Sequence, residues 1–364
     1  MKIVIDAREL RSSTGRYIER LLYYLQKINS NHQFVVLLKP GDFDSWTPSG
    51  SNFSKLACPH KEFGAGEQIG FLKQLKSIDA NLVHFGMVQQ PVFYGGPKVT
   101  TIHDLTTTKF NNPSKNPIVF KFKQEVYKWL IKKVSRDSRF IITPSNFVKK
   151  DLIQFTGVSE EKIFVTYEAA DKISDSPQPI NELVNKKFLM YVGRPNPHKN
   201  LARLIEAFEI VRSNNPDLKL VIAGKKDFLM QKHEQDAQKR DLLGSSVVFT
   251  GFVSEGELRW LYENTLAYVF PSLSEGFGLP GLEAMTHGAP VISSNATCLP
   301  EIYKDGAHYF NPNDKNDIAS KIKDVINNEK LRKELINKGG AIAEKYSWQK
   351  MAEQTLNIYE KALS

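Results

Sequence analysis

Residues 268–295 constrain the fold of this chain more than any other stretch. The apolar run 267–270 predicts a buried strand that stops at Pro271, because proline cannot take part in the ladder of a central strand. A turn with G-x-G-x-x-G spacing follows at 276–281, and Pro280 is typical of the start of a helix over 279–286. Residues 290–294 are the next expected strand. This order of elements predicts a β-α-β unit of a parallel sheet.

The turn in this unit has the chemistry of an anion site. Amide groups at a helix start and the helix dipole favour negative charge, and two carboxylates, Glu275 and Glu283, flank the turn. A nicotinamide or flavin site would need an acid about twenty residues further on, where the chain instead has Ser293, Ser294 and Asn295. This reading is therefore disfavoured. A purely structural tight turn remains an alternative.

The strand and helix alternation runs twice along the 364 residues, which predicts an α/β protein with two Rossmann-like parallel-sheet domains facing across a cleft. The first domain is expected at 1–172 and the second at 188–346. Pro177 and Pro179 mark a linker at 173–187. A last helix at 347–364 is expected, with packing against the first domain as one possibility.

Charge is distributed unevenly between the two halves. The net charge is +9, and residues 1–172 hold 25 Lys and Arg against 16 Asp and Glu, so the excess belongs to the first half. Such asymmetry favours a membrane surface or a phosphorylated acceptor as partner; no nucleic-acid partner is expected. The sequence has no apolar run of membrane-spanning length, and neither a transmembrane helix nor a signal peptide is expected. Cys58 and Cys298 are expected to be reduced thiols, and the expected location is the cytoplasm.

A basic amphipathic helix is predicted from Ile118 to Arg136. Its apolar residues are expected broadly on one side and six Lys and Arg residues lie among them. Peripheral contact with an anionic membrane is one interpretation of this pattern, and an ordinary surface helix whose lysine stems cover apolar ground is the other. The apolar set is Phe122, Val126, Trp129, Leu130 and Val134.

Three further groups of residues suggest chemistry. Arg194 and Lys199 stand in the loop after an expected strand, where two cations beside a helix start suit a diphosphate. His103 follows another strand, at the end where open α/β sheets hold their ligands. The pair Asp42 and Asp44 has the D-x-D spacing of a metal pair, but it stands in a loop for which a solvated turn is the favoured reading.

Taken together, these motifs resemble glycosyltransferase family 4, the group 1 glycosyltransferases with the two-domain GT-B fold. The resemblance rests on S-E-G-F-G-L-P-x-L-E-A-M at 274–285, V-G-R and K-N at 192–200, and His103-Asp104. The turn at Gly15 and Thr143-Pro144-Ser145 extend it over nearly the whole chain. One departure is the stretch 167–171, Y-E-A-A-D, where family members often carry an N-G-[IV]-D turn.

The resemblance implies a retaining, metal-independent hexosyltransferase without a cofactor. It implies a nucleotide diphosphate sugar as donor, with GDP-mannose preferred and a UDP-sugar next, and a glycan or lipid-linked acceptor in polysaccharide synthesis. Its catalytic residues would be His103, Glu275, Arg194 and Lys199. Donor binding would add Glu283 for the ribose, the amides of the turn for the sugar, the backbone of Val253 for the base, and Gly15 for the phosphates. The turn amides are those of Phe277, Gly278 and Leu279.

Two other classes of function remain open. A nucleotide-sugar epimerase or hydrolase of the same architecture would also use a cationic diphosphate site, and an epimerised donor would identify it. A non-catalytic sugar-nucleotide or membrane-binding module would show no turnover with any donor. The glycosidase double displacement is not adopted, because no second acid is placed to act with Glu275.

Overall fold

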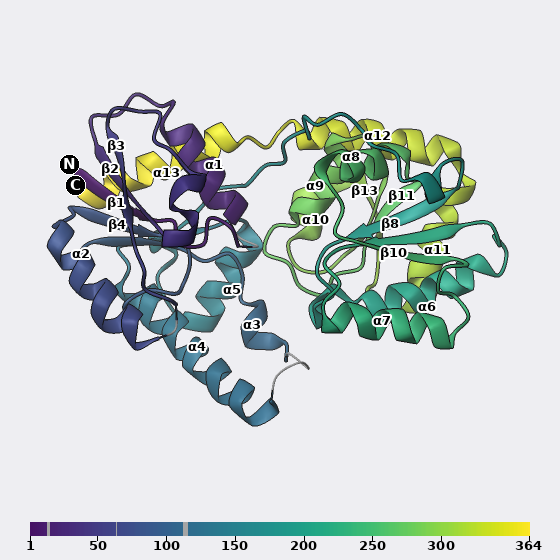
Figure 1. Ribbon diagram of the computed structural model, residues 1–364, viewed down its shortest axis with the longest axis horizontal. Helices are drawn as coiled ribbons and strands as arrows, with labels where there is room; N and C mark the ends of the chain where they lie inside the picture. Colours follow the sequence, from purple (N-terminus) through teal and green to yellow (C-terminus); the bar gives the residue numbers. More distant parts are fainter. Residues whose placement is uncertain (13–14, 63, 112–115) are drawn as a thin grey trace. The chain divides into compact units, whose positions relative to one another are not determined.

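The computed structural model describes residues 1–12, 15–62, 64–111 and 116–364. The described residues form two compact units. The first holds residues 1–108, 122–168 and 347–364, and the second holds 169–346 with the described residues of 109–121. Each is built on one parallel sheet (Figure 1), which confirms the predicted fold class.

The sheet of the first unit has the strand order β3-β2-β1-β4-β5-β6-β7, all parallel. Its order reverses between β1 and β4, which creates a crevice at the carboxyl ends of these strands. Apolar residues of β1 and β4 are fully buried, as expected for a sheet covered on both faces. The strands are β1 Lys2–Asp6, β2 Gln33–Leu38, β3 Phe53–Ala57, β4 Leu82–Phe85, β5 Lys98–Thr101, β6 Phe140–Thr143 and β7 Ile163–Val165.

Helices cover this sheet, and the last helix of the chain is one of them. Tyr359 of that helix lies 2.6 Å from Nδ1 of His84 on β4, and both side chains are fully buried. The C-terminal helix therefore belongs to the core of the first unit. The helices are α1 Gly15–Leu25, α2 Leu72–Ile78, α3 Thr106–Lys109, α4 Pro117–Asp137, α5 Asn146–Thr156 and α13 Trp348–Leu363.

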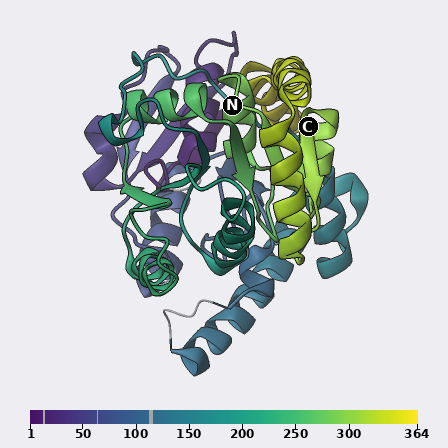
Figure 2. The same ribbon diagram turned by 90° about the vertical axis from the view of Figure 1, so that its right-hand side faces the viewer.

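The apolar residues predicted on one side of α4 do not all pack against the sheet. Leu130 and Val134 are buried in the core of the first unit, whereas Phe122, Val126 and Trp129 are exposed. The apolar side of the helix is thus only partly covered by the rest of the first unit. Its first half extends away from that sheet (Figure 1, Figure 2).

The sheet of the second unit has the order β10-β9-β8-β11-β12-β13, again all parallel, with the reversal between β8 and β11. Its strands are β8 Phe188–Val192, β9 Lys219–Ala223, β10 Val247–Gly251, β11 Ala267–Phe270, β12 Val291–Ser294 and β13 Ala307–Phe310. Its helices are α6 Leu201–Arg212, α7 Phe228–Lys239, α8 Glu255–Asn264, α9 Leu279–Thr286, α10 Leu299–Tyr303, α11 Lys315–Asn327 and α12 Glu329–Ala343.

Local sequence signals fix several of these elements. Ser254 and Glu257 form the capping box that starts α8, and α9 has the bounds that its proline and glycines predict.

The segment 173–187, which was expected to be a linker, is irregular but bound to the second unit. The backbone N–H of Gln178 donates to the Gly256 carbonyl at 3.0 Å, and Leu183 is buried. The division between the units falls at 168, not at 172.

Candidate active site

Two loops meet at the reversal point of the second sheet. They follow β8 and β11, which are neighbouring parallel strands, so both loops leave the same edge. The Leu273 amide donates to the His198 carbonyl at 2.7 Å, and Nδ2 of Asn200 donates to the carbonyls of Pro271 at 3.0 Å and Pro312 at 2.8 Å. Asn200 is buried and has a φ of 59°, a left-handed conformation that asparagine tolerates well. The two loops predicted to form one site are therefore tied together.

An ion pair joins the predicted site residues of these loops. Nζ of Lys199 lies 2.6 Å from Oε1 of Glu275, with 19% and 11% of the two side chains exposed. The loop of Glu275 is itself held in place, because its amide donates to Oγ1 of Thr297 at 3.2 Å and its carbonyl accepts from Sγ of Cys298 at 3.3 Å. This arrangement is a fixed, partly desolvated charge pair at the strand ends.

The other charged residues of the predicted site lie on the same two β-α connections. Arg194 is exposed on the loop after β8, and its carbonyl accepts from the Tyr191 hydroxyl at 3.3 Å. Glu283 lies one turn into α9 and is half-buried; its Oε2 accepts from the Tyr262 hydroxyl at 3.4 Å. Val253 is half-buried on the connection between β10 and α8. The second unit thus brings two cations and two carboxylates to one region of its sheet edge.

The glycine-rich turn is shaped by packing as well as by backbone freedom. Gly278 has a φ of +95°, which disfavours other residues, and its carbonyl accepts from the Tyr303 hydroxyl. A Cβ atom on Gly281 would collide with the same hydroxyl. The ring of Phe277 is buried edge-on to Tyr346, with 5.6 Å between centroids. These contacts hold the first residues of α9, including Leu279, where helix amides lack partners within the helix.

His103 lies at the reversal point of the first sheet. Its Nε2 is 3.1 Å from the Gly86 carbonyl, which follows β4, and its Nδ1 is 3.3 Å from Oε1 of Glu168, which follows β7. The exposed fractions of the His103 and Glu168 side chains are 15% and 6%. The ring of Tyr17 stands edge-on to the imidazole at 4.9 Å.

Both ring nitrogens of His103 face acceptors, an arrangement that favours the doubly protonated imidazole. Burial by itself lowers the pKa of His103, but the hydrogen bond and charge of Glu168, with the Gly86 carbonyl, outweigh burial and raise it. The surroundings of His103 therefore favour the charged form of its ring. The sequence marked 167–171 only as a departure from a family pattern, and it did not identify Glu168 as the partner of His103.

The sequence analysis did not identify a second cluster of buried charged residues in the first unit. Arg8, which is 2% exposed, lies 2.8 Å from Oδ2 of Asp6 and 3.0 Å from Oε1 of Glu67. Asp6 ends β1, and with Arg8 and Gly86 it lines a small pocket at the reversal point. An acid at the end of the first strand with an arginine two residues later was the signal available in the sequence.

The two remaining sequence-predicted positions have local explanations. Gly15 is the first residue of α1, and a Cβ atom there would collide with the Leu10 carbonyl, so its glycine is required by packing; residues 13–14 of the expected turn lie outside the described residues. Asp42 lies in a 3₁₀ turn, with Oδ1 3.9 Å from Nε of Arg11. Within the described part of the chain, no three His, Cys, Asp or Glu side chains gather as a metal site.

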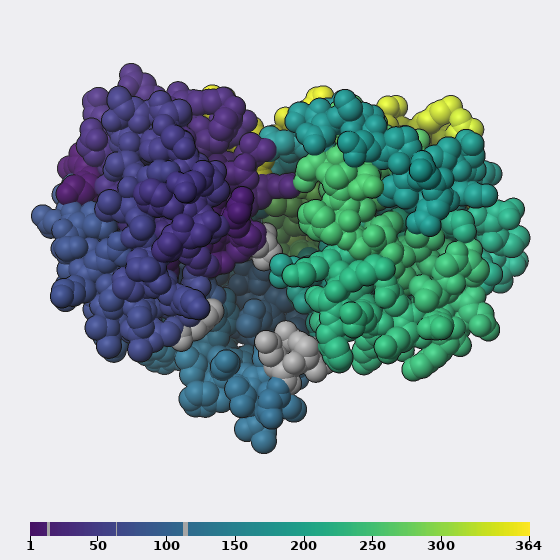
Figure 3. Space-filling model, viewed as in Figure 1, coloured from purple at the N-terminus to yellow at the C-terminus, as the bar shows by residue number. Residues whose placement is uncertain are grey.

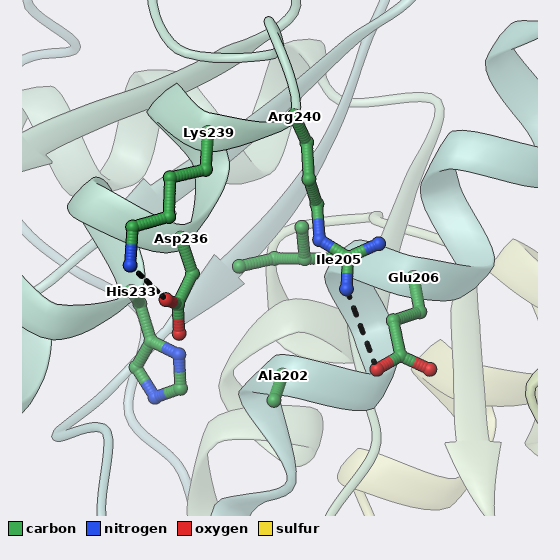
Figure 4. A pocket seen from close by; sticks show the side chains of 7 residues that line it. All are labelled: Ala202, Ile205, Glu206, His233, Asp236, Lys239 and Arg240. Atoms are coloured by element: carbon green, nitrogen blue, oxygen red, sulfur yellow. Dashed lines mark ion pairs between the residues drawn. The ribbon is translucent and has the colours of Figure 1, made fainter.

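A surface pocket of about 410 Å³ lies between α6 and α7 (Figure 4). Ion pairs border it: Arg240 lies 3.8 Å from Glu206, and Lys239 lies 3.9 Å from Asp236. None of the predicted site residues lines it. Because ligands of open α/β sheets bind at the strand ends, the candidate active site is the pair of loops after β8 and β11 and not this pocket.

Solved structures share this architecture across the whole chain. Sucrose-phosphate synthase from Thermosynechococcus elongatus has a TM-score of 0.79 at 17% identity, covering 99% of this chain and 98% of that one. Anabaena Alr3699/HepE, solved in complex with UDP-glucose, has a TM-score of 0.76 at 17% identity, covering 99% and 100%. The fold is therefore that of the two-domain GT-B glycosyltransferases.

Sequence comparison narrows this class. The model for glycosyl transferases group 1 matches residues 172–341, and that for glycosyltransferase family 4 matches residues 14–172. O-antigen chain mannosyltransferase B of Escherichia coli is 30% identical over 281 residues, 72% of this chain and 70% of the relative. O-antigen chain mannosyltransferase RfbU of Salmonella typhimurium is 31% identical over 227 residues, 62% and 60%. The chain belongs to the group 1 glycosyltransferases of family 4 and is a hexosyltransferase, as its sequence motifs predicted.

Proposed function

We propose that this enzyme transfers a hexose from a nucleotide diphosphate sugar to a glycan or lipid-linked acceptor, with retention at the anomeric carbon and without a metal ion. GDP-mannose is the first candidate donor, since the relatives at about 30% identity are mannosyltransferases. A UDP-sugar is the second, given the UDP-glucose complex of a structural neighbour. The observation that carries the proposal is the Lys199–Glu275 pair at the reversal point of the second sheet.

Leaving-group stabilisation is assigned to the cations of the second unit. Departure of a nucleoside diphosphate develops negative charge, and preorganised positive groups stabilise that charge where it forms. Arg194 binds the diphosphate through its planar fork and Lys199 through its single ammonium group. Lys199 is already oriented by Glu275, so little reorganisation is needed when the donor arrives.

Sugar and nucleoside binding are assigned to the carboxylates and amides beside the cations. The Glu275 carboxylate accepts hydrogen bonds from the sugar hydroxyls, and the amides of Phe277, Gly278 and Leu279 donate hydrogen bonds to the sugar. Glu283 accepts hydrogen bonds from the ribose hydroxyls, and the Val253 backbone contacts the base. The same ion pair therefore links diphosphate binding to sugar orientation, because moving Lys199 also moves Glu275.

His103 is assigned an electrostatic role in this scheme. Glu168 and the Gly86 carbonyl favour the protonated ring, so we assign a positive charge to the sheet edge of the first unit. Such a charge stabilises an electron-rich leaving group without a proton transfer. Gly15 contributes its close-packed backbone at the start of α1, and we place the reaction in the cytoplasm.

The proposal is tested by donor turnover in alanine variants. Purified enzyme is incubated with GDP-mannose and with UDP-sugars, without added metal, and release of the nucleoside diphosphate is followed. Arg194→Ala and Lys199→Ala should each lower turnover by a factor on the order of 10². Lys333→Ala, at an exposed pair on α12, is the control and should match the wild type. Unchanged turnover in both site variants would refute the assignment.

Product analysis distinguishes the reaction classes. NMR of the transferred sugar should show the anomeric configuration of the donor. An inverted product would contradict the proposed stereochemistry, and a free epimerised nucleotide sugar would identify an epimerase instead.

A further inference from the structure

One side of α4 exposes several large apolar side chains to solvent. It consists of five residues, Ile118, Val119, Phe122, Val126 and Trp129, with exposed fractions of 81%, 52%, 71%, 46% and 52%. Large exposed apolar side chains occur singly elsewhere in the described residues, but α4 alone carries five of the fourteen. A contiguous apolar patch of this kind indicates an interaction surface.

The five residues form one stripe along the helix. At 3.6 residues per turn they fall within about 100° of its circumference, and at about 1.5 Å per residue they extend over roughly 16 Å. The adjoining sector of the helix is already occupied, because Leu130, Ile131 and Val134 pack in the core of the first unit. The stripe is therefore the part of the apolar side that the core leaves exposed. Figure 3 shows one side of the protein's surface, including part of α4.

Basic side chains border the stripe. Lys121, Lys128 and Lys132 lie along one side and Lys123 along the other, by helical spacing. The helix as a whole has six Lys and Arg residues against two acids, Glu125 and Asp137. An apolar stripe between cationic borders matches the depth profile of an anionic bilayer, where acyl chains lie beneath negatively charged headgroups.

We propose that α4 docks on an anionic lipid membrane, with the stripe among the upper acyl chains and the bordering lysines at the headgroups. Charge favours this occupant over a second copy of the chain, since a two-fold contact through α4 would place two strongly basic helices against each other. Among the described residues, no helix is long and apolar enough to cross a membrane. The docking concerns α4 and goes beyond the proposed donor chemistry.

Vesicle sedimentation of the full chain tests the docking. Vesicles of phosphatidylglycerol with phosphatidylcholine should pull down the wild type, vesicles of phosphatidylcholine alone should bind it much more weakly, and added salt should weaken binding. The double variant Phe122→Ser/Trp129→Ser should bind on the order of 100-fold more weakly, because two large side chains no longer leave water. Lys121→Glu/Lys123→Glu should lose the preference for anionic vesicles.

A matched control removes equally exposed rings elsewhere. Phe228 and Phe252 are 65% and 87% exposed in the second unit, and Phe228→Ser/Phe252→Ser should sediment like the wild type. Trp129 also reports directly, because its fluorescence should shift to shorter wavelength with anionic vesicles, and the shift should be lost in Trp129→Phe.

Three outcomes would overturn the docking. These are no binding to anionic vesicles, equal binding by the Phe122→Ser/Trp129→Ser variant and the wild type, or a wild-type dimer that the same variant converts to a monomer, which would make the face a self-interface. Donor turnover in that variant should equal that of the wild type. A failure of docking is thereby separated from a failure of the donor site, which the Arg194 and Lys199 variants report.

Discussion

Breaking the Lys199–Glu275 pair is the perturbation that most directly probes the geometry of the site. The changes are Lys199→Met and Glu275→Gln, which keep side-chain size while removing one charge each, made singly and together. The pair connects the loops after β8 and β11, so its loss should loosen the region that the donor occupies.

The separation and burial of the two charges set the magnitude. Two unit charges 2.6 Å apart attract by about 6 kcal/mol at an effective dielectric constant of about 20. Desolvation of two mostly buried side chains and their ordering offset most of this attraction. A net coupling of about 2 kcal/mol remains, within the usual range for hydrogen bonds to charged groups.

A double-mutant cycle measures the coupling. The free energy of unfolding is obtained from urea denaturation of the wild type, the two single variants and the double variant, followed by circular dichroism. The control is the Glu329–Lys333 pair on α12, which has the same 2.6 Å separation but is about two-thirds exposed. Its cycle should give no measurable coupling, since exposed pairs contribute little. Equal coupling in the two cycles, or none in the first, would refute the reasoning.

Three further predictions concern other residues of the site. Glu168→Gln should lower the pKa of His103. The free energy of unfolding of the wild type should therefore exceed that of the variant, and the difference should be largest at mildly acidic pH. This difference should shrink as pH rises through the folded-state pKa, which thermal denaturation at several pH values checks. Gly278→Ala should lower the free energy of unfolding, measured by urea denaturation, by about 1–3 kcal/mol, because the residue must adopt a φ of +95°. It should also lower donor turnover. Asn200→Ala should lower the free energy of unfolding by about 1–3 kcal/mol, since the buried Pro271 carbonyl loses its Asn200 donor and the Pro312 carbonyl keeps only Arg203; an unchanged free energy of unfolding would contradict the assigned clamp.

Much of the fold follows from local signals in the sequence. The bounds of α9 and the capping box of α8 depend on residues within a few positions of each other, and the strands of both reversal points are short apolar runs. The meeting of Lys199 and Glu275 follows from topology, because parallel neighbouring strands place their following loops at one edge.

The features that could not be predicted from the sequence depend on packing between distant segments. The sequence analysis grouped Leu130 with Trp129, but Leu130 is buried in the core and Trp129 is exposed to solvent. Helical periodicity predicts an apolar side and does not say how much of it a sheet covers. Glu168 could not be matched to His103 because the two are 65 residues apart in sequence and meet only through the order of β5, β6 and β7. Gly278 and Gly281 read as phosphate-loop glycines, but Tyr303 is an equal reason for both.

The central claim is that the second unit binds a nucleotide diphosphate sugar at the edge defined by β8, β11 and α9. The most direct measurement is a thermal-shift and slow-hydrolysis screen of the purified chain against GDP-, UDP- and ADP-sugars without added metal. The account predicts that one donor raises the melting temperature and slowly releases its nucleoside diphosphate, and that Glu283→Ala abolishes both effects. If no nucleotide sugar stabilises the wild type, or if Glu283→Ala responds as the wild type does, the assigned donor site is wrong.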